Sequence, residues 1–179
     1  MHNFPHFIHI GRAIMGDLTD IVLLVQEVVR QMNSMGNYQW NEHYPSVELL
    51  SKDIAQGNLF VAITTTHSQK TIAGIITIDT HWAEEYLQIG WQQPLETSFF
   101  VHRLGVLPAH QHQKIAQQLL LFADRWALDN HKTAIKLDTY EENTPAENLF
   151  FRQGYQLRGA IVYENYEGKY RCYEKCLLS

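Results

Sequence analysis

Residues 111–114, with the sequence QHQK, stand between an apolar run that Pro108 ends and a helical pattern that begins at Ile115. They include no acidic side chain. The first amides of a helix have no acceptor within the helix, and the helix dipole favours negative charge beside them. A helix start of this kind is suited to an anion that a ligand supplies, such as a phosphate group.

Aromatic and acidic side chains gather in two expected connections, residues 38–45 (YQWNEHYP) and residues 81–97. Indole and phenol faces attract cations, and carboxylates add charge attraction, so these segments suit a cationic amine. Core packing of the aromatic residues and a plain acidic surface loop are the alternatives. The candidate substrate-binding residues are Trp40, Tyr44, Trp82 and Tyr86.

An amine attacks a carbonyl carbon only after it loses a proton, because an ammonium group has no lone pair. We expect an imidazole or a carboxylate to accept that proton. The candidates, in falling order, are His102, Glu96 and Glu42. His102 is equally consistent with a hydrogen-bonded histidine in the core. The pair His110 and His112 lacks an evident third ligand, so we expect no metal.

The elements that must position these residues follow from hydrophobic periodicity and from capping residues. We expect helices from a cap at Asp17 or Thr19 to Gly36, from Ser46 to about Ala55, over residues 115–129, and from a Thr144 capping box to Gly154. The expected strands are residues 7–13, 59–65, 71–80, 98–107, 134–140, 155–163 and 171–178. This order predicts an α/β (α+β) fold, a mixed sheet with helices on its faces.

Three motifs in order resemble the GNAT N-acetyltransferase superfamily: VHRLGVLP at 101–108, QHQKIA at 111–116 and NTPAENLFFRQGY at 143–155. The resemblance implies a mostly antiparallel sheet splayed between its middle strands, an acetyl-CoA cofactor and direct attack by a primary amine. It places the pyrophosphate on residues 111–116 and the pantetheine arm along residues 104–106. The cofactor-binding residues it implies are Leu104, Gly105, Val106, Gln111, His112, Gln113, Lys114, Ile115, Ala116, Asn143, Leu149 and Phe150.

Two residues depart from the family pattern. Lys114 stands where a glycine is usual, and glycine permits backbone conformations that lysine adopts at a cost. Phe150 stands where the family often has a tyrosine that protonates the leaving thiolate. These departures keep a non-catalytic acyl-CoA-binding module open as an alternative, and acetylation of a protein amine is another.

Composition sets the remaining expectations. The chain has 179 residues, 45% of them apolar, and a net charge of −5, which favours one domain over residues 1–179 and disfavours nucleic acid. No apolar run suggests a membrane span, and the first residues lack signal-peptide features. Cys172 and Cys176, about 13 Å apart on one strand, are expected as free thiols in a cytoplasmic protein. The final strand pair could support a homodimer.

Overall fold

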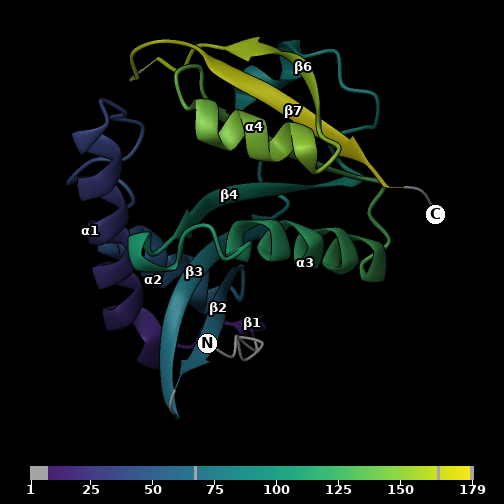
Figure 1. The fold of residues 1–179 in the computed structure, drawn as a ribbon. Helices are drawn as coiled ribbons and strands as arrows, with labels where there is room; N and C mark the ends of the chain where they lie inside the picture. Colours follow the sequence, from purple (N-terminus) through teal and green to yellow (C-terminus); the bar gives the residue numbers. More distant parts are fainter. Residues whose placement is uncertain (1–7, 67, 165, 178–179) are drawn as a thin grey trace. The chain divides into compact units, whose positions relative to one another are not determined.

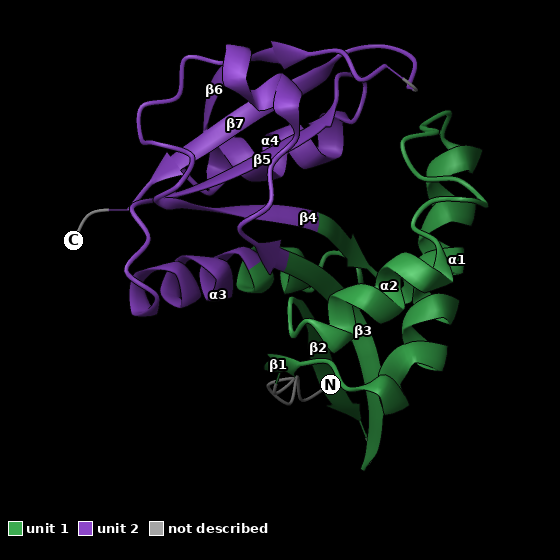
Figure 2. Cartoon of the chain, turned by 180° about the vertical axis from the view of Figure 1, so that it is seen from behind, with its two compact units in different colours: residues 1–77, 103–119 green, residues 78–102, 120–179 purple. Residues whose placement is uncertain are grey.

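The computed structural model describes residues 8–66, 68–164 and 166–177, which form two compact units (Figure 2). Unit 1 comprises the described residues of Met1–Thr77 and Arg103–Leu119, and unit 2 those of Ile78–His102 and Leu120–Ser179. Strands β3 and β4 and helix α3 each contribute residues to both units. The two units are therefore joined by continuous secondary structure along the chain.

Unit 1 contains β1 (Ile8–Arg12), α1 (Leu18–Ser34), α2 (Val47–Ala55), β2 (Leu59–Thr66), most of β3 (Gln69–Asp79) and the end of β4 (Ser98–Val106). It also holds the short 3-10 helices η1 (Met15–Asp17) and η3 (Pro108–His110) and the first residues of α3 (Ile115–Asp129). Strands β1 and β2 and strands β2 and β3 pair antiparallel. The predicted elements of this half are confirmed, except that Phe7 lies outside the described residues.

Helices cover both faces of the strands in unit 1 (Figure 1). Buried Ile21, Leu24 and Val28 of α1 recur at helical spacing and pack in one core cluster with Ile75 of β3. The next residue back along β3, Gly74, faces the other way. A Cβ there would lie 2.9 Å from the Ile115 side chain, so α3 can approach this face only because residue 74 is glycine.

Unit 2 contains the start of β4, the remainder of α3, β5 (Ala134–Tyr140), α4 (Thr144–Arg152), β6 (Gln156–Ile161) and β7 (Tyr170–Cys176), with η2 (Glu84–Gln88) in the long loop before β4. Strand β7 pairs antiparallel with both β5 and β6, and β4 runs parallel to β5. The mixed, mostly antiparallel sheet that the sequence predicts is therefore confirmed. The strand order is β1-β2-β3-β4 in unit 1 and β4-β5-β7-β6 in unit 2.

The pairing of β4 with β5 is short. Backbone pairs join residues Ser98–Phe100 of β4 to Ala134–Lys136 of β5. Both strands continue beyond these pairs, β5 as far as Tyr140, and among the described residues no further pair joins them. Parallel strands that stop pairing while both continue must diverge, which agrees with the predicted opening between the middle strands.

One local prediction is wrong. The first residue of α4 is Thr144, but its cap is Asn143, whose side chain accepts a hydrogen bond from the Ala146 amide at 3.4 Å. Glu147, expected to complete a capping box with Thr144, instead binds Arg171 and Tyr173 of β7. The Arg171 guanidinium group pairs with the Glu147 carboxylate as two ionised groups through two hydrogen bonds, whereas a capping box offers that carboxylate one neutral amide.

Candidate functional site

Two non-glycine residues in the loop before α3 adopt a backbone conformation that favours glycine. His112 and Lys114 have φ angles of 63° and 62°, in the left-handed region that favours glycine. Both side chains are exposed, as is that of Gln113, and the first turn of α3 contains no acidic residue. Lys114 therefore adopts a backbone conformation that favours glycine and adds a cation at the helix start.

The loop is attached to α1 by side chains. Gln111 and Gln31 exchange two amide hydrogen bonds, of 2.6 and 3.2 Å. Ile115 is buried against β3 and Ala116 is partly buried, so packing also holds the start of α3 in place. Among residues 8–66, 68–164 and 166–177, no acidic side chain accepts a hydrogen bond from the amides of residues 113–116. The amides at this helix start are therefore suited to a ligand anion.

The last residues of β4 pack against the connection between α1 and α2. A Cβ on Gly105 would lie 3.1 Å from the Trp40 ring, so Gly105 leaves space for a buried indole. Leu104 and Val106, on either side, are partly buried. Trp40 belongs to the hydrophobic core of unit 1, which favours the packing alternative for this residue.

Arg103 interrupts the regular pleat of β4 with a φ angle of 49°. Its guanidinium group forms a buried ion pair with Asp53 at 2.7 Å, and Asp53 also accepts a hydrogen bond from Thr77. Tyr44 lies 3.5 Å from the same guanidinium group. A non-glycine residue at positive φ costs stability, and here the side chain of that residue is held by a buried ion pair.

In unit 2, His102 forms a pair with Asp79, a residue that the sequence analysis did not select. Its Nε2 atom lies 3.4 Å from Asp79 Oδ1 and 3.3 Å from the His81 carbonyl oxygen. Both partners accept hydrogen bonds, so Nε2 carries the proton of the neutral ring and Nδ1 carries the lone pair. Burial acts to raise the pKa of Asp79, but the hydrogen bonds from His102 and from the His81 amide, with the charge of either imidazole when it is protonated, outweigh it and lower that pKa.

Asp138, on β5, is the second carboxylate that the sequence analysis missed. Its two oxygens accept hydrogen bonds from the hydroxyl groups of Tyr86, at 2.6 Å, and Tyr163, at 3.3 Å. Burial raises the pKa of Asp138, and the hydrogen bonds offset only part of this effect. Tyr86, predicted as a substrate contact, is buried and uses its hydroxyl group here, whereas Trp82 is exposed beside Phe100.

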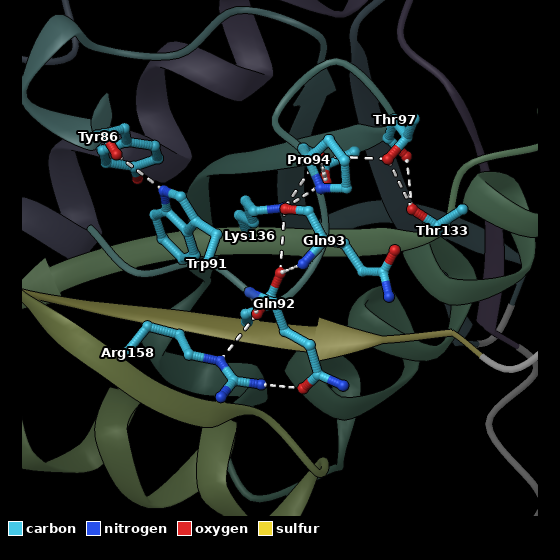
Figure 3. Close-up of polar contacts among 11 residues, drawn as sticks. Tyr86, Trp91, Gln92, Gln93, Pro94, Thr97, Thr133, Lys136 and Arg158 are labelled. Atoms are coloured by element: carbon cyan, nitrogen blue, oxygen red, sulfur yellow. Dashed lines mark hydrogen bonds and ion pairs between the residues drawn. The ribbon is translucent and has the colours of Figure 1, made fainter. Parts of the chain in front are cut away.

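Within unit 2, a buried ion cluster holds the long loop over residues 81–97 against strands β5, β6 and β7 (Figure 3). The Glu174 carboxylate accepts hydrogen bonds from the backbone amides of Gln92 and Gln93, at 2.8 and 2.9 Å. Lys136 and Arg158 approach the same carboxylate at 3.1 and 2.8 Å. These donors lower the pKa of Glu174 although burial acts to raise it.

Lys136 ties the same loop from the other side of the carboxylate. Its ammonium group donates to the Gln93 and Pro94 carbonyl oxygens and to the Ser98 hydroxyl group, and it lies 5.3 Å from the centre of the Trp91 ring. Trp91 in turn donates its indole N–H to the Tyr86 carbonyl oxygen at 2.9 Å. The ion cluster therefore fixes the backbone of Tyr86, whose hydroxyl group donates a hydrogen bond to Asp138.

The other predicted catalytic residues lie elsewhere. Glu96 is exposed in the turn before β4, and the five strand residues from Ser98 to His102 alone span about 13 Å. Glu42 belongs to unit 1, is 86% exposed and lies 3.4 Å from His43. It borders a pocket of about 630 Å³ between α1 and α2, whose walls include Val25 and Leu50.

Of the three predicted cofactor residues in α4 and its cap, Asn143 caps the helix and Leu149 is partly buried. Phe150 is buried between Tyr155 and Tyr173, at ring distances of 5.9 and 5.7 Å. Tyr140, Tyr155 and Tyr163 are the residues that could supply a hydroxyl group in place of a tyrosine at 150; Tyr163 binds Asp138, and the buried Tyr155 hydroxyl has no described partner.

Two signals in the sequence could have found the missed carboxylates. Asp79 ends a strand that is apolar from Ile72 to Ile76, and Asp138 interrupts a mostly buried one. A carboxylate in such a position is costly unless it is paired, so it marks a polar network or a site. In the described residues no group of three histidine, cysteine or acidic side chains is arranged to hold a metal ion. No described helix combines the length and apolarity that a membrane span requires.

Comparison with known proteins adds evidence of ancestry. Residues 25–155 match the model of the acetyltransferase (GNAT) family. Streptothricin acetyltransferase from Escherichia coli is 34% identical over 63 residues, which cover 35% of this chain and 36% of that protein, so the match spans about a third of each.

Solved structures share the fold over nearly the whole chain. An acetyltransferase of the GNAT family from Streptococcus agalactiae is 22% identical with a TM-score of 0.80, covering 96% of each chain. The PaiA N-acetyltransferase from Thermoplasma acidophilum, solved in complex with coenzyme A, is 20% identical with a TM-score of 0.69, covering 95% of this chain and 99% of that one. From the family match over most of its length, the chain belongs to the GNAT family of acetyltransferases.

Proposed function

We propose that the protein is an N-acetyltransferase that transfers the acetyl group of acetyl-CoA to a primary amine. The observation that carries this proposal is the loop before α3, where Lys114 adopts a φ angle of 62°, in the left-handed region that favours glycine, at a position where glycine is usual in the family pattern. The backbone conformation available to glycine is therefore present although the glycine is not. This supports cofactor binding over loss of the site.

The family pattern implies which residues of each unit would hold the cofactor. In unit 1, the amides and Lys114 of residues 111–116 suit the pyrophosphate, and the backbone of residues 104–106 suits the pantetheine arm. In unit 2, Asn143 and the side chains of Leu149 and Phe150 are the residues that the family pattern implies. Bound acetyl-CoA supplies the thioester whose C–S bond breaks as the amine nitrogen forms the new C–N bond, with release of CoA as a thiol.

His102 is the proposed general base. The Asp79 carboxylate and the His81 carbonyl oxygen fix its tautomer, so Nδ1 is free to accept the proton that the ammonium group loses. Asp79 is a positioning residue, because it acts through the imidazole and stabilises the positive charge that forms there. Catalysis by direct attack needs no acyl-enzyme, and burial raises the pKa of the Cys172 thiol to about 12, which makes it a poor nucleophile.

The family match from residue 25 to residue 155 includes parts of both compact units, which supports a single functional domain. Cys172 and Cys176 are free thiols on one strand, which supports a reducing, cytoplasmic location. The streptothricin acetyltransferase acts on the compound in its name, and the short match to it supports a small-molecule amine as the acceptor.

The test combines binding and turnover on the whole chain. Isothermal calorimetry with CoA should show binding that Lys114→Glu weakens, and a thiol-release assay with acetyl-CoA should show turnover with primary amines. CoA binding without turnover on any small amine or lysine peptide would favour the non-catalytic module. Absence of CoA binding would contradict both functions. Turnover with peptides alone would identify a protein amine as the acceptor.

A further inference from the structure

Asp138 and His102 occupy matching positions on the two strands that separate in unit 2. The pairs Ser98–Ala134, Phe99–Ile135 and Phe100–Lys136 set the register of β4 and β5. If the same register is extended by two residues, His102 falls opposite Asp138. The pairs have ended by then, so these two residues lie at the point where the strands have begun to diverge.

The two side chains also share a face of the sheet. Residues two apart on a strand point the same way, so His102 projects with Phe100, and Asp138 projects with Lys136. Phe100 and Lys136 both contact the long loop, Phe100 through Tyr86 at 5.7 Å and Lys136 through Gln93 at 2.8 Å. When the His102 imidazole is protonated, its charge lowers the pKa of Asp138, so the two groups are within electrostatic reach of each other. An imidazole and a carboxylate therefore face the same side, one from each strand.

Asp138 has hydrogen-bond partners but no cationic partner of its own. In the described parts of the chain, no lysine or arginine forms an ion pair with Asp138. Its partners, Tyr86 and Tyr163, are neutral donors. This contrasts with Glu174 on the neighbouring strand, which has both Lys136 and Arg158. A partly buried carboxylate without a counter-charge gains stability from any cation that reaches it.

Tyr86, which donates a hydrogen bond to this carboxylate, belongs to a cluster of aromatic rings. The Tyr86 ring lies 5.2 Å from Trp91 and 5.7 Å from Phe100, and Phe100 lies 5.7 Å from the exposed Trp82. Aromatic faces attract cations, most strongly where water is excluded. A carboxylate among aromatic rings is the chemistry that recognises an ammonium group with an apolar body.

We propose that Asp138 binds the ammonium group of the acceptor amine and holds it opposite His102, which takes its proton. This inference rests on the proposed function and adds the residue that selects the acceptor. Binding requires the ammonium cation, which the carboxylate on β5 would hold. Reaction requires the neutral amine, which forms when the imidazole on β4 accepts the proton.

The test is calorimetry on the whole protein with saturating CoA, which needs no turnover and so is independent of the enzyme assignment. The probes are 2-phenylethylamine and its neutral analogue 2-phenylethanol. The wild type should bind the amine at least about tenfold more tightly than the alcohol. Asp138→Asn keeps the shape of the side chain but replaces the negative charge with a neutral amide, so it should remove that preference. Tyr163→Phe, which removes one donor and keeps the charge, should retain most of it.

Three outcomes would overturn the proposal: a wild type that binds both probes equally, an Asp138→Asn variant that keeps the preference, or a Tyr163→Phe variant that loses it as fully. Unchanged CoA affinity and thermal midpoint in Asp138→Asn show that the variant is folded. If that variant unfolds, Asp138→Glu serves instead, because it keeps the charge and should keep the preference. A wild type that shows no turnover but still prefers the amine would contradict the proposed function and leave this binding site in place.

Discussion

The loop before α3 and the sheet face around Asp138 handle charge in opposite ways. The loop presents backbone amides, and its side chains at 112–114 are exposed. The sheet face presents Asp79, His102 and Asp138, each held by named hydrogen-bond partners. Backbone donors tolerate a change of side chain, as Lys114 shows, whereas a side-chain site depends on each residue and on its partners. Substitutions should therefore have small effects in the loop and large effects on the sheet face.

The largest effect is expected at His102. His102→Ala removes the proposed base and should lower kcat by about 10³-fold, within the range for general base catalysis. CoA affinity should stay the same, because the loop in unit 1 is intact. Steady-state kinetics and calorimetry measure the two quantities. His131→Asn is the control, since His131 is exposed at a φ angle of 57° that asparagine tolerates, and it should change kcat less than threefold.

A large loss of stability is expected from Glu174→Gln. Removing the charge leaves Lys136 and Arg158 without their shared partner, and breaking a buried ion pair costs about 3 kcal/mol. Urea unfolding measures this change. Glu147→Gln is the matched control, because the Glu147–Arg171 pair is more exposed and should contribute no more than about 1 kcal/mol. Equal losses in the two variants would remove the distinction between a buried anchor and a surface pair.

The same carboxylate predicts a pH dependence of stability. The pKa of Glu174 is lower in the folded protein than its ordinary value of 4.5, so the unfolded chain binds the proton more tightly. Its contribution is complete above pH 4.5 and is lost as the pH falls through the lower folded-state pKa. The difference in unfolding free energy between wild type and Glu174→Gln should therefore shrink below pH 4.5. A difference that is constant from pH 7 to pH 3 would contradict this assignment.

A smaller effect is expected in the loop. Lys114→Glu places an anion at the helix start and should weaken CoA binding by about fivefold at low salt, with a smaller effect at high salt. Calorimetry at two salt concentrations measures it. An unchanged affinity at both would mean that the phosphates bind elsewhere, and the loop would then share no function with the sheet face.

The smallest effect sharpens the role of the backbone. Lys114→Gly removes a side chain from a φ angle of 62° and should raise the unfolding free energy by up to about 1 kcal/mol relative to Lys114→Ala. Both variants lose the cation, so their CoA affinities should be alike. Urea unfolding of the pair compares them. A less stable glycine variant would show that the left-handed conformation at residue 114 carries no strain.

Much of the fold was predictable because its signals are local. The spacing of Ile21, Leu24 and Val28 defines α1, and the Ser46 cap of α2 forms as expected, accepting from the Leu49 amide at 3.2 Å. The polar helix start at residues 111–114 was also visible, since it depends on neighbours in the sequence. The cap at Asn143 was missed because Glu147 is bound by β7, a strand more than twenty residues later.

The sequence by itself determined the order of helices and strands, the family and the loop that suits a phosphate, because each depends on residues close together in the chain. Only the tertiary structure decided which side chains meet. Asp79 pairs with His102, and Asp138 receives Tyr86 and Tyr163, across separations that no periodicity records. Such contacts join β3 to β4, and β5 to the long loop and to the segment after β6, so they are set by packing between distant segments.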